Sequence, residues 1–154
     1  MQPTIRPAVS SDTDTIIEFS RRLNKEDPAF TGDFYFDEPA VRAALVQLVA
    51  DSSLGRVWLV SWSNTPIGYA VLTFGFSLES HGRDGILDEI YLAADYRGQG
   101  LGTQVVEFVE AEAWRLELKK LFLEVERPNT RAKKFYARLG FVEHDRHLMS
   151  KVLT

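Results

Sequence analysis

Three alternate glycines follow an arginine near the middle of the chain, in the run Arg97-Gly98-Gln99-Gly100-Leu101-Gly102. The residues before this run have the β-branched and aromatic character of a strand, and the apolar residues after it recur with helical spacing. The glycines are therefore expected at a helix N-terminus, where backbone N–H groups lack partners and the dipole is positive. An anion, most often phosphate, can approach such N–H groups closely. A glycine turn that serves only packing is the simpler alternative.

Two adjacent acids, Asp88 and Glu89, lie in the apolar strand before the glycines. Buried carboxylates need a partner or a role, and consecutive strand residues point to opposite faces, so only one acid is expected to face a given cleft. A base there could act on an alkyl ammonium, from which removing the proton at pH 7 costs about 4–5 kcal/mol. A salt bridge to Arg83 or Arg97 is the alternative.

A second motif follows in residues 129–141, where Asn129, Ala132, Phe135, Tyr136 and Gly140-Phe141 fit N-x-x-A-x-x-[FL]-Y-x-x-x-G-F. A helix over residues 129–139 would align Asn129, either Ala132 or Lys133, and Tyr136 along one stripe. The glycine run itself is neither a P-loop, because no lysine follows it, nor the dinucleotide pattern G-x-G-x-x-G.

In these two motifs the chain resembles the GNAT superfamily of N-acetyltransferases, over residues 86–143. The resemblance implies acetyl-CoA as cosubstrate, no metal, and direct transfer of the acetyl group to a primary amine. It also implies the following cofactor-binding residues: Ile90, Tyr91 and Leu92 through their backbone; Arg97, Gly98, Gln99, Gly100, Leu101, Gly102 and Thr103 around the pyrophosphate; and Asn129, Lys133 and Tyr136 on the later helix.

The resemblance also suggests catalytic roles. Tyr136 would lie near the sulfur, where a phenol with a pKa of about 10 can protonate a thiolate leaving group with a pKa of roughly 8.5. Covering the core beside Phe135 is the alternative role for this tyrosine. Polyamine-acetylating members carry an acid at the position of Asp88, so Asp88 is the first candidate base and Glu89 the second, acting directly or through water.

Composition limits the other classes of function. The chain has 154 residues, 45% of them hydrophobic, 26% charged and none of them cysteine, which predicts one domain over residues 1–154 without disulfides or an acyl-cysteine intermediate. No apolar run is long enough for a membrane span and no signal peptide is present, so a cytoplasmic protein that binds no membrane is expected. The net charge of −4 argues against nucleic acid and for a cationic partner.

The order of the elements predicts an α/β (α+β) fold with one mixed sheet of six to seven strands. The strands are mostly antiparallel with one central parallel pair, and helices lie on both faces. The expected strands are residues 4–8, 56–62, 67–76, 86–92, 120–126, 141–143 and 148–153. Helices are expected to begin at Ser11, with Asp14 in a capping box, and at Asp37. The aromatic loop Phe30, Phe34, Tyr35 and Phe36 is either a core plug or a substrate lip.

The predicted function is therefore an acetyl-CoA-dependent N-acetyltransferase for a cationic small amine of the polyamine, lysine-like or aminoglycoside class. A protein N-terminal or lysine acetyltransferase, a catalytically silent acyl-CoA-binding module and a dinucleotide-binding protein are the alternatives. The sequence identifies neither the acceptor nor the oligomeric state, and a homodimer is one option.

Overall fold

The computed structural model describes residues 2–26 and 36–153, and it divides into two units, Met1–Glu124 and Val125–Thr154. The aromatic residues Phe30, Phe34 and Tyr35 of the expected loop lie outside the described residues. That both units belong to one domain over residues 1–154 stays a prediction.

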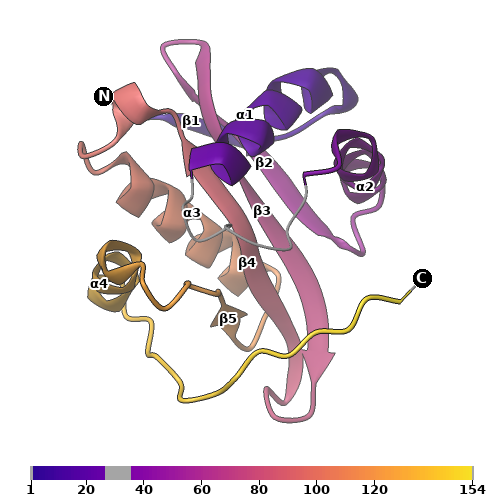
Figure 1. Cartoon of the computed structure of the whole chain (residues 1–154), viewed down its shortest axis with the longest axis vertical. Helices are drawn as coiled ribbons and strands as arrows, with labels where there is room; N and C mark the ends of the chain where they lie inside the picture. Colours follow the sequence, from indigo (N-terminus) through magenta and orange to yellow (C-terminus); the bar gives the residue numbers. More distant parts are fainter. Residues whose placement is uncertain (1, 27–35, 154) are drawn as a thin grey trace. The chain divides into compact units, whose positions relative to one another are not determined.

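The first unit contains one mixed sheet of five strands, in the order β1-β2-β3-β4-β5 (Figure 1). The strands are β1 (Thr4–Pro7), β2 (Gly55–Trp62), β3 (Thr65–Ser77), β4 (Gly82–Leu92) and β5 (Leu121–Phe122). Neighbouring strands are antiparallel except β4 and β5, which are parallel. The mixed sheet and its parallel pair are as predicted. The pair lies at the edge of the described sheet and not at its centre, and the described residues form five strands and not six or seven.

Several strand boundaries differ from the sequence prediction. The strand β3 begins at Thr65 and not at Ile67, because Ser63 and Asn64, with positive φ angles of 47° and 66°, form the turn directly after β2. The strand β4 begins at Gly82 and not at Ile86, because a tight turn at residues 78–81 lets the β3–β4 hairpin start sooner. The strand β5 contains only Leu121 and Phe122 of the predicted residues 120–126, because β4 pairs with it at two positions alone.

Helices cover both faces of this sheet (Figure 1). On one face, α1 (Thr13–Glu26) and α2 (Glu38–Ala50) pack against odd-numbered residues of β2, β3 and the end of β4. This cluster contains Ile16, Ile17, Phe19, Leu45, Val57, Leu59, Tyr69, Val71 and Tyr91. On the other face lies α3 (Leu101–Arg115), whose Phe108 ring meets Trp58 of β2 edge-on at 5.6 Å.

The start of α1 corrects one predicted cap. The expected capping box of Ser11 and Asp14 is wrong, because a short 3-10 helix, η1 (Ser10–Asp12), precedes α1. The carboxylate of Asp12 accepts a hydrogen bond from the Val9 N–H at 2.8 Å, and Asp14 instead pairs with Arg42 of α2. The cap of α2 is confirmed, since Asp37 Oδ1 accepts from the Ala40 N–H at 3.1 Å.

The second unit contains α4 (Thr130–Arg138), which ends before Gly140 with its φ of 92°. The expected hairpin of residues 141–143 and 148–153 is not formed in the described part of this unit. Val142, Leu148 and Val152 are 76%, 77% and 82% exposed, so the apolar alternation that predicted strands lacks a partner strand to pair with. No helix within residues 2–26 or 36–153 is long and apolar enough to cross a membrane.

Candidate functional site

The glycine loop lies between β4 and α3 and is open where a ligand would approach. Gly98 and Gly100 have φ angles of 73° and 81°, which side chains rarely adopt, and a Cβ atom at either position would meet nothing within 4 Å. Gly100 is the N-cap of α3 and supplies no side-chain hydrogen bond to its first turn. Leu101, Gly102 and Thr103 begin the helix, so their N–H groups lack intrahelical partners. The geometry is that of an anion site at a helix N-terminus.

Arg97, the first residue of the loop, points toward α1. Its Nε donates to the Leu92 carbonyl at 2.7 Å, and its Nη2 donates to Glu26 Oε2 at the same distance. Its guanidinium also lies 5.2 Å from the centre of the Tyr91 ring. A cavity of about 210 Å³ adjoins this contact and is lined by Leu23, Glu26, Ile90, Tyr91, Leu92 and Arg97.

Along its second half, one side of β4 pairs with no strand in the described part of the chain. The parallel pairing with β5 ends at Ile86, and among the described residues no strand continues it toward Leu92. The Ala93 N–H bonds to Ile67 of β3 at 2.7 Å, so by antiparallel alternation Ile90 and Leu92 direct their backbone groups away from β3. Two of the three residues predicted to bind the cofactor through their backbone therefore direct backbone groups away from β3, and of these the Leu92 carbonyl already accepts from Arg97 Nε.

A β-bulge interrupts β4 at Asp88. Leu87 pairs with Leu72 and Glu89 pairs with Val71, which leaves Asp88 as an extra residue without an opposite partner. The regular alternation used to assign Asp88 and Glu89 to opposite faces is therefore wrong at this point. Glu89 joins Tyr69 and Tyr91 on the face covered by α1, and the negative charge of Asp88 acts on both Glu89 and Tyr69.

Glu89 is half-buried and has no cationic partner among the residues that the structure describes. Burial, and next the charge of Asp88, raise the pKa of the Glu89 carboxyl to about 7, against an opposing hydrogen bond from Tyr69. The Tyr69 hydroxyl donates that bond to Glu89 Oε2 at 3.2 Å. Asp88 is exposed, although neighbouring protein atoms remove enough water to raise the pKa of its carboxyl as well.

The alternative role for Asp88 and Glu89 was a structural salt bridge to Arg83 or Arg97, and the described residues do not form it. Within the described ranges neither Asp88 nor Glu89 is in an ion pair. Arg97 pairs with Glu26, and Arg83 lies 4.6 Å above the ring of Phe74. Two carboxylates without cations are therefore available for a positively charged ligand.

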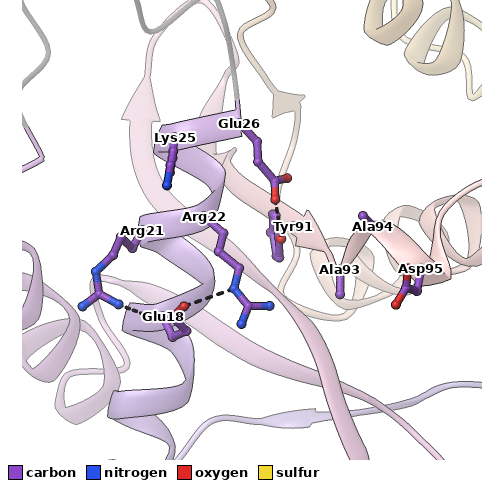
Figure 2. Close-up of a pocket in the computed structure, with 9 residues that line it drawn as sticks. All are labelled: Glu18, Arg21, Arg22, Lys25, Glu26, Tyr91, Ala93, Ala94 and Asp95. Carbon is purple, nitrogen blue, oxygen red and sulfur yellow. Dashed lines mark hydrogen bonds and ion pairs between the residues drawn. The ribbon is translucent and has the colours of Figure 1, made fainter.

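A larger cavity of about 640 Å³ lies between α1 and the end of β4 (Figure 2). Its charged residues come mainly from α1, where Glu18 holds Arg21 and Arg22, with Lys25 and Glu26 at the end of the helix. Figure 2 shows Tyr91 beside Glu26, to which its hydroxyl donates at 3.3 Å. Sequence reasoning missed this contribution of α1, although the spacing of Glu18, Arg22 and Glu26 marks one polar helix face.

The second unit places Asn129, Lys133 and Tyr136 on or beside α4. Asn129 is the N-cap and accepts from the Ala132 N–H at 3.1 Å, and Lys133 Nζ lies 3.4 Å from Glu143 Oε1. Burial raises the pKa of Tyr136, whose ring meets those of Phe135 and Phe141 edge-on at 5.0 and 5.7 Å. Asn129, Lys133 and Tyr136 belong to the second unit, whereas the predicted residues on β4 belong to the first.

A family model described as "Acetyltransferase (GNAT) family" matches residues 20–141, which include the glycine loop and α4. The chain belongs to the GNAT acetyltransferase family. The resemblance found in the two sequence motifs is confirmed, and with it the enzyme class of an acetyl-CoA-dependent N-acetyltransferase.

Two named acetyltransferases resemble the chain in sequence, and one solved structure resembles it in fold. The chain is 35% identical to the thialysine N-epsilon-acetyltransferase of Bos taurus over 48% of its own length and 43% of that protein. It is 26% identical to the Mus musculus protein of the same name over 88% of its length and 82% of that protein. A crystal structure of a predicted acetyltransferase from Clostridium acetobutylicum with acetyl-CoA aligns with a TM-score of 0.81, 18% identity, and coverage of 97% of this chain and 96% of that chain.

Proposed function

We propose that this GNAT enzyme transfers the acetyl group of acetyl-CoA directly to the primary amine of a cationic small molecule. The polyamine, lysine-like and aminoglycoside classes fit this description. The observation that carries the proposal is the pair of carboxylates at the bulge of β4, which have no cationic partner in the described residues. Both mammalian relatives are named thialysine N-epsilon-acetyltransferase. That name refers to the side-chain amine of a lysine-like compound, which supports the same class of acceptor.

The glycine loop and the unpaired edge of β4 are the proposed cofactor site. The N–H groups that follow Gly100 would hold the pyrophosphate, where the helix dipole of α3 favours negative charge. The outward backbone groups of Ile90 and the N–H of Leu92 would bond the pantetheine arm in the manner of an added strand, since the Leu92 carbonyl already accepts from Arg97 Nε. Acetyl-CoA supplies the thioester that the amine attacks.

Glu89 is the proposed base and Asp88 the proposed anchor for the amine. A carboxyl with a pKa of about 7 is a better proton acceptor at neutral pH than an ordinary glutamate. The bound amine must lose one proton before its lone pair can attack the thioester carbon, and Glu89 would take it directly or through water. The exposed Asp88 would attract the cation. This assignment makes Glu89 the first candidate base, whereas the resemblance to polyamine-acetylating members favoured Asp88.

Tyr136 is the proposed proton donor to the departing thiolate. A tyrosine phenol is protonated at neutral pH, which is the form that can donate, and burial moves the pKa of Tyr136 further from that pH. Asn129 and Lys133, on the same unit, complete the proposed set of cofactor contacts. Since Asn129 Oδ1 already accepts the cap bond of α4, its side-chain NH₂ is the group left for the pantetheine arm.

The test is release of free thiol from acetyl-CoA across a panel of polyamines, lysine analogues, aminoglycosides and lysine peptides. We expect turnover with a cationic small amine. Glu89→Gln should lower kcat by about 100-fold or more while acetyl-CoA affinity stays within twofold. Asp88→Asn should mainly raise KM for the amine.

Two other results would replace the proposal. Saturable acetyl-CoA binding without turnover on any amine would indicate a silent acyl-CoA-binding module. Turnover confined to the peptides would indicate a protein acetyltransferase. Full activity of Glu89→Gln would remove this residue from the reaction.

A further inference from the structure

The hydroxyl of Tyr69 on β3 contacts the side chain proposed as the base. We infer that Tyr69 is a positioning residue for Glu89: its hydroxyl holds one carboxylate oxygen in place and favours the ionised form that accepts the proton. This inference rests on the proposed role of Glu89 and adds a residue that neither sequence motif includes.

The ring of Tyr69 is held rigidly, which fixes its hydroxyl. The residue is fully buried and lies directly opposite Tyr91 in the β3–β4 ladder. Its ring stacks on Phe19 of α1 at 6.4 Å between centroids, and the Tyr91 ring lies at the same distance on the other strand. With both strands and α1 holding the ring, the O–H is directed at Glu89 Oε2, 3.2 Å away.

The phenol can donate but does not compete for the proton. Burial, and next the charge of Glu89, raise the pKa of Tyr69 far above its ordinary value, so it stays neutral wherever the enzyme would work. A neutral O–H that donates to a carboxylate stabilises the charged form of that carboxylate. The bond therefore opposes burial and Asp88, the two influences that hold the Glu89 carboxyl protonated.

Among the described groups around Glu89, the Tyr69 hydroxyl is the one that stabilises its ionised carboxylate. On β4 the charged neighbour is Asp88, which has the opposite effect. From α1, Phe19 brings a ring and the buried Ser20 brings a hydroxyl that faces Tyr69. The charged residues Arg22, Glu26 and Arg97 bear on Tyr91, two residues farther along the strand.

The test compares wild type with Tyr69→Phe, which keeps the stacked ring and removes the donor. The pKa of Glu89 is read from the carbon-13 shift of its carboxyl during a pH titration, which needs no activity. Because a hydrogen bond to a charged group is lost, we expect this pKa to rise by roughly one unit. The acidic limb of the kcat/KM profile should move up equally, so that activity lost at neutral pH returns at higher pH, while the acetyl-CoA Kd changes less than twofold.

The matched control is Phe19→Leu, which disturbs the same ring stack and removes no hydroxyl. It should lower Tm and leave both the Glu89 pKa and the acidic limb in place. Should Tyr69→Phe fail to fold, replacing Tyr69 by a ring-fluorinated tyrosine makes the phenol a stronger donor, and the Glu89 pKa should then fall.

The outcomes separate this inference from the proposed function. An unchanged Glu89 pKa in folded Tyr69→Phe overturns the inference, even when Glu89→Gln still abolishes turnover. A shifted carboxyl titration with an unmoved kcat/KM limb supports the contact but shows that Glu89 is not the base, which overturns the proposed reaction and the positioning role with it. Equal shifts in both readouts support the inference.

Discussion

Nη2 of Arg97 lies 2.7 Å from Oε2 of Glu26, and this ion pair joins the glycine loop to the last turn of α1. The hydrogen bond from Arg97 is the main cause that lowers the pKa of Glu26. Both side chains are about two-fifths exposed, at 41% and 42%, so the pair contributes little to folding stability. The ion pair matters instead for ligand binding. The Glu26 carboxylate binds the same Arg97 guanidinium that the family resemblance assigns to the pyrophosphate.

Glu26→Gln should therefore tighten acetyl-CoA binding. The change removes a negative charge beside the proposed phosphate site and frees the Arg97 guanidinium from its carboxylate partner. We expect Kd to fall roughly threefold at low salt and the gain to shrink at high salt, as measured by calorimetry. Weaker binding would mean that Glu26 instead holds Arg97 in the orientation the cofactor needs.

Gly100→Asp should abolish saturable acetyl-CoA binding, whereas Gly100→Asn should retain part of it. Asparagine and aspartate tolerate the left-handed conformation at this N-cap about equally, with its φ of 81°, so both variants carry a similar backbone cost. Only aspartate adds a charge that repels phosphate. We expect an affinity difference of at least about tenfold between the two variants at low salt. Equal affinities in two folded variants would contradict an anion site at this loop.

Glu89→Gln should change how stability depends on pH. The folded-state pKa of about 7 lies above the ordinary value of 4.5, so the folded protein retains this proton longer than the unfolded chain. The wild-type free energy of unfolding should therefore fall as pH rises from about 4.5 to 7, by on the order of 1–3 kcal/mol, and then level off. Glu89→Gln should remove that fall and raise Tm at pH 8 by several degrees, with little gain at pH 4.

The same glutamine substitution at the exposed Glu107 of α3 is the control for this titration. It should leave the wild-type pH dependence in place. A wild-type Tm that is flat between pH 5 and pH 8 would show that Glu89 is ionised as easily as an ordinary glutamate.

Tyr136→Phe should lower kcat by about tenfold or more and leave the acetyl-CoA Kd unchanged. The ring contacts with Phe135 and Phe141 survive this substitution, so the loss would report the hydroxyl alone. Phe135→Leu removes a ring contact but no hydroxyl, and it should cost stability more than kcat. Wild-type turnover of Tyr136→Phe would exclude the phenol as proton donor.

The sequence predicted best those features that local residues determine. The prediction for the glycine run needed only the strand before it and the helix after it, and the run does lie at the N-terminus of α3, which begins at Leu101. Asp37 capped α2 through a hydrogen bond to a residue only three positions away. The predicted hairpin of residues 141–143 and 148–153 depended on partner strands elsewhere, and apolar alternation alone does not supply them.

The parts of the site that sequence reasoning missed depend on long-range contacts. Tyr69 reads as an ordinary core aromatic in a strand, and its partner Glu89 is 20 residues away. Glu26 is 71 residues from Arg97, so no motif could join them. The bulge at Asp88 has no local signal either, because it is defined by the register between β3 and β4.

That bulge also separates β4 into two halves of opposite parity. Before Asp88, odd-numbered Leu87 lies opposite Leu72, outside the α1 cluster, whereas after it odd-numbered Glu89 and Tyr91 lie on the α1 face. Deleting residue 88 would therefore do more than remove one carboxylate. It would force the side chains of one half of the strand, either the hairpin half or the loop half, onto the opposite face of the sheet. A substitution at residue 88 is therefore easier to accommodate than a deletion.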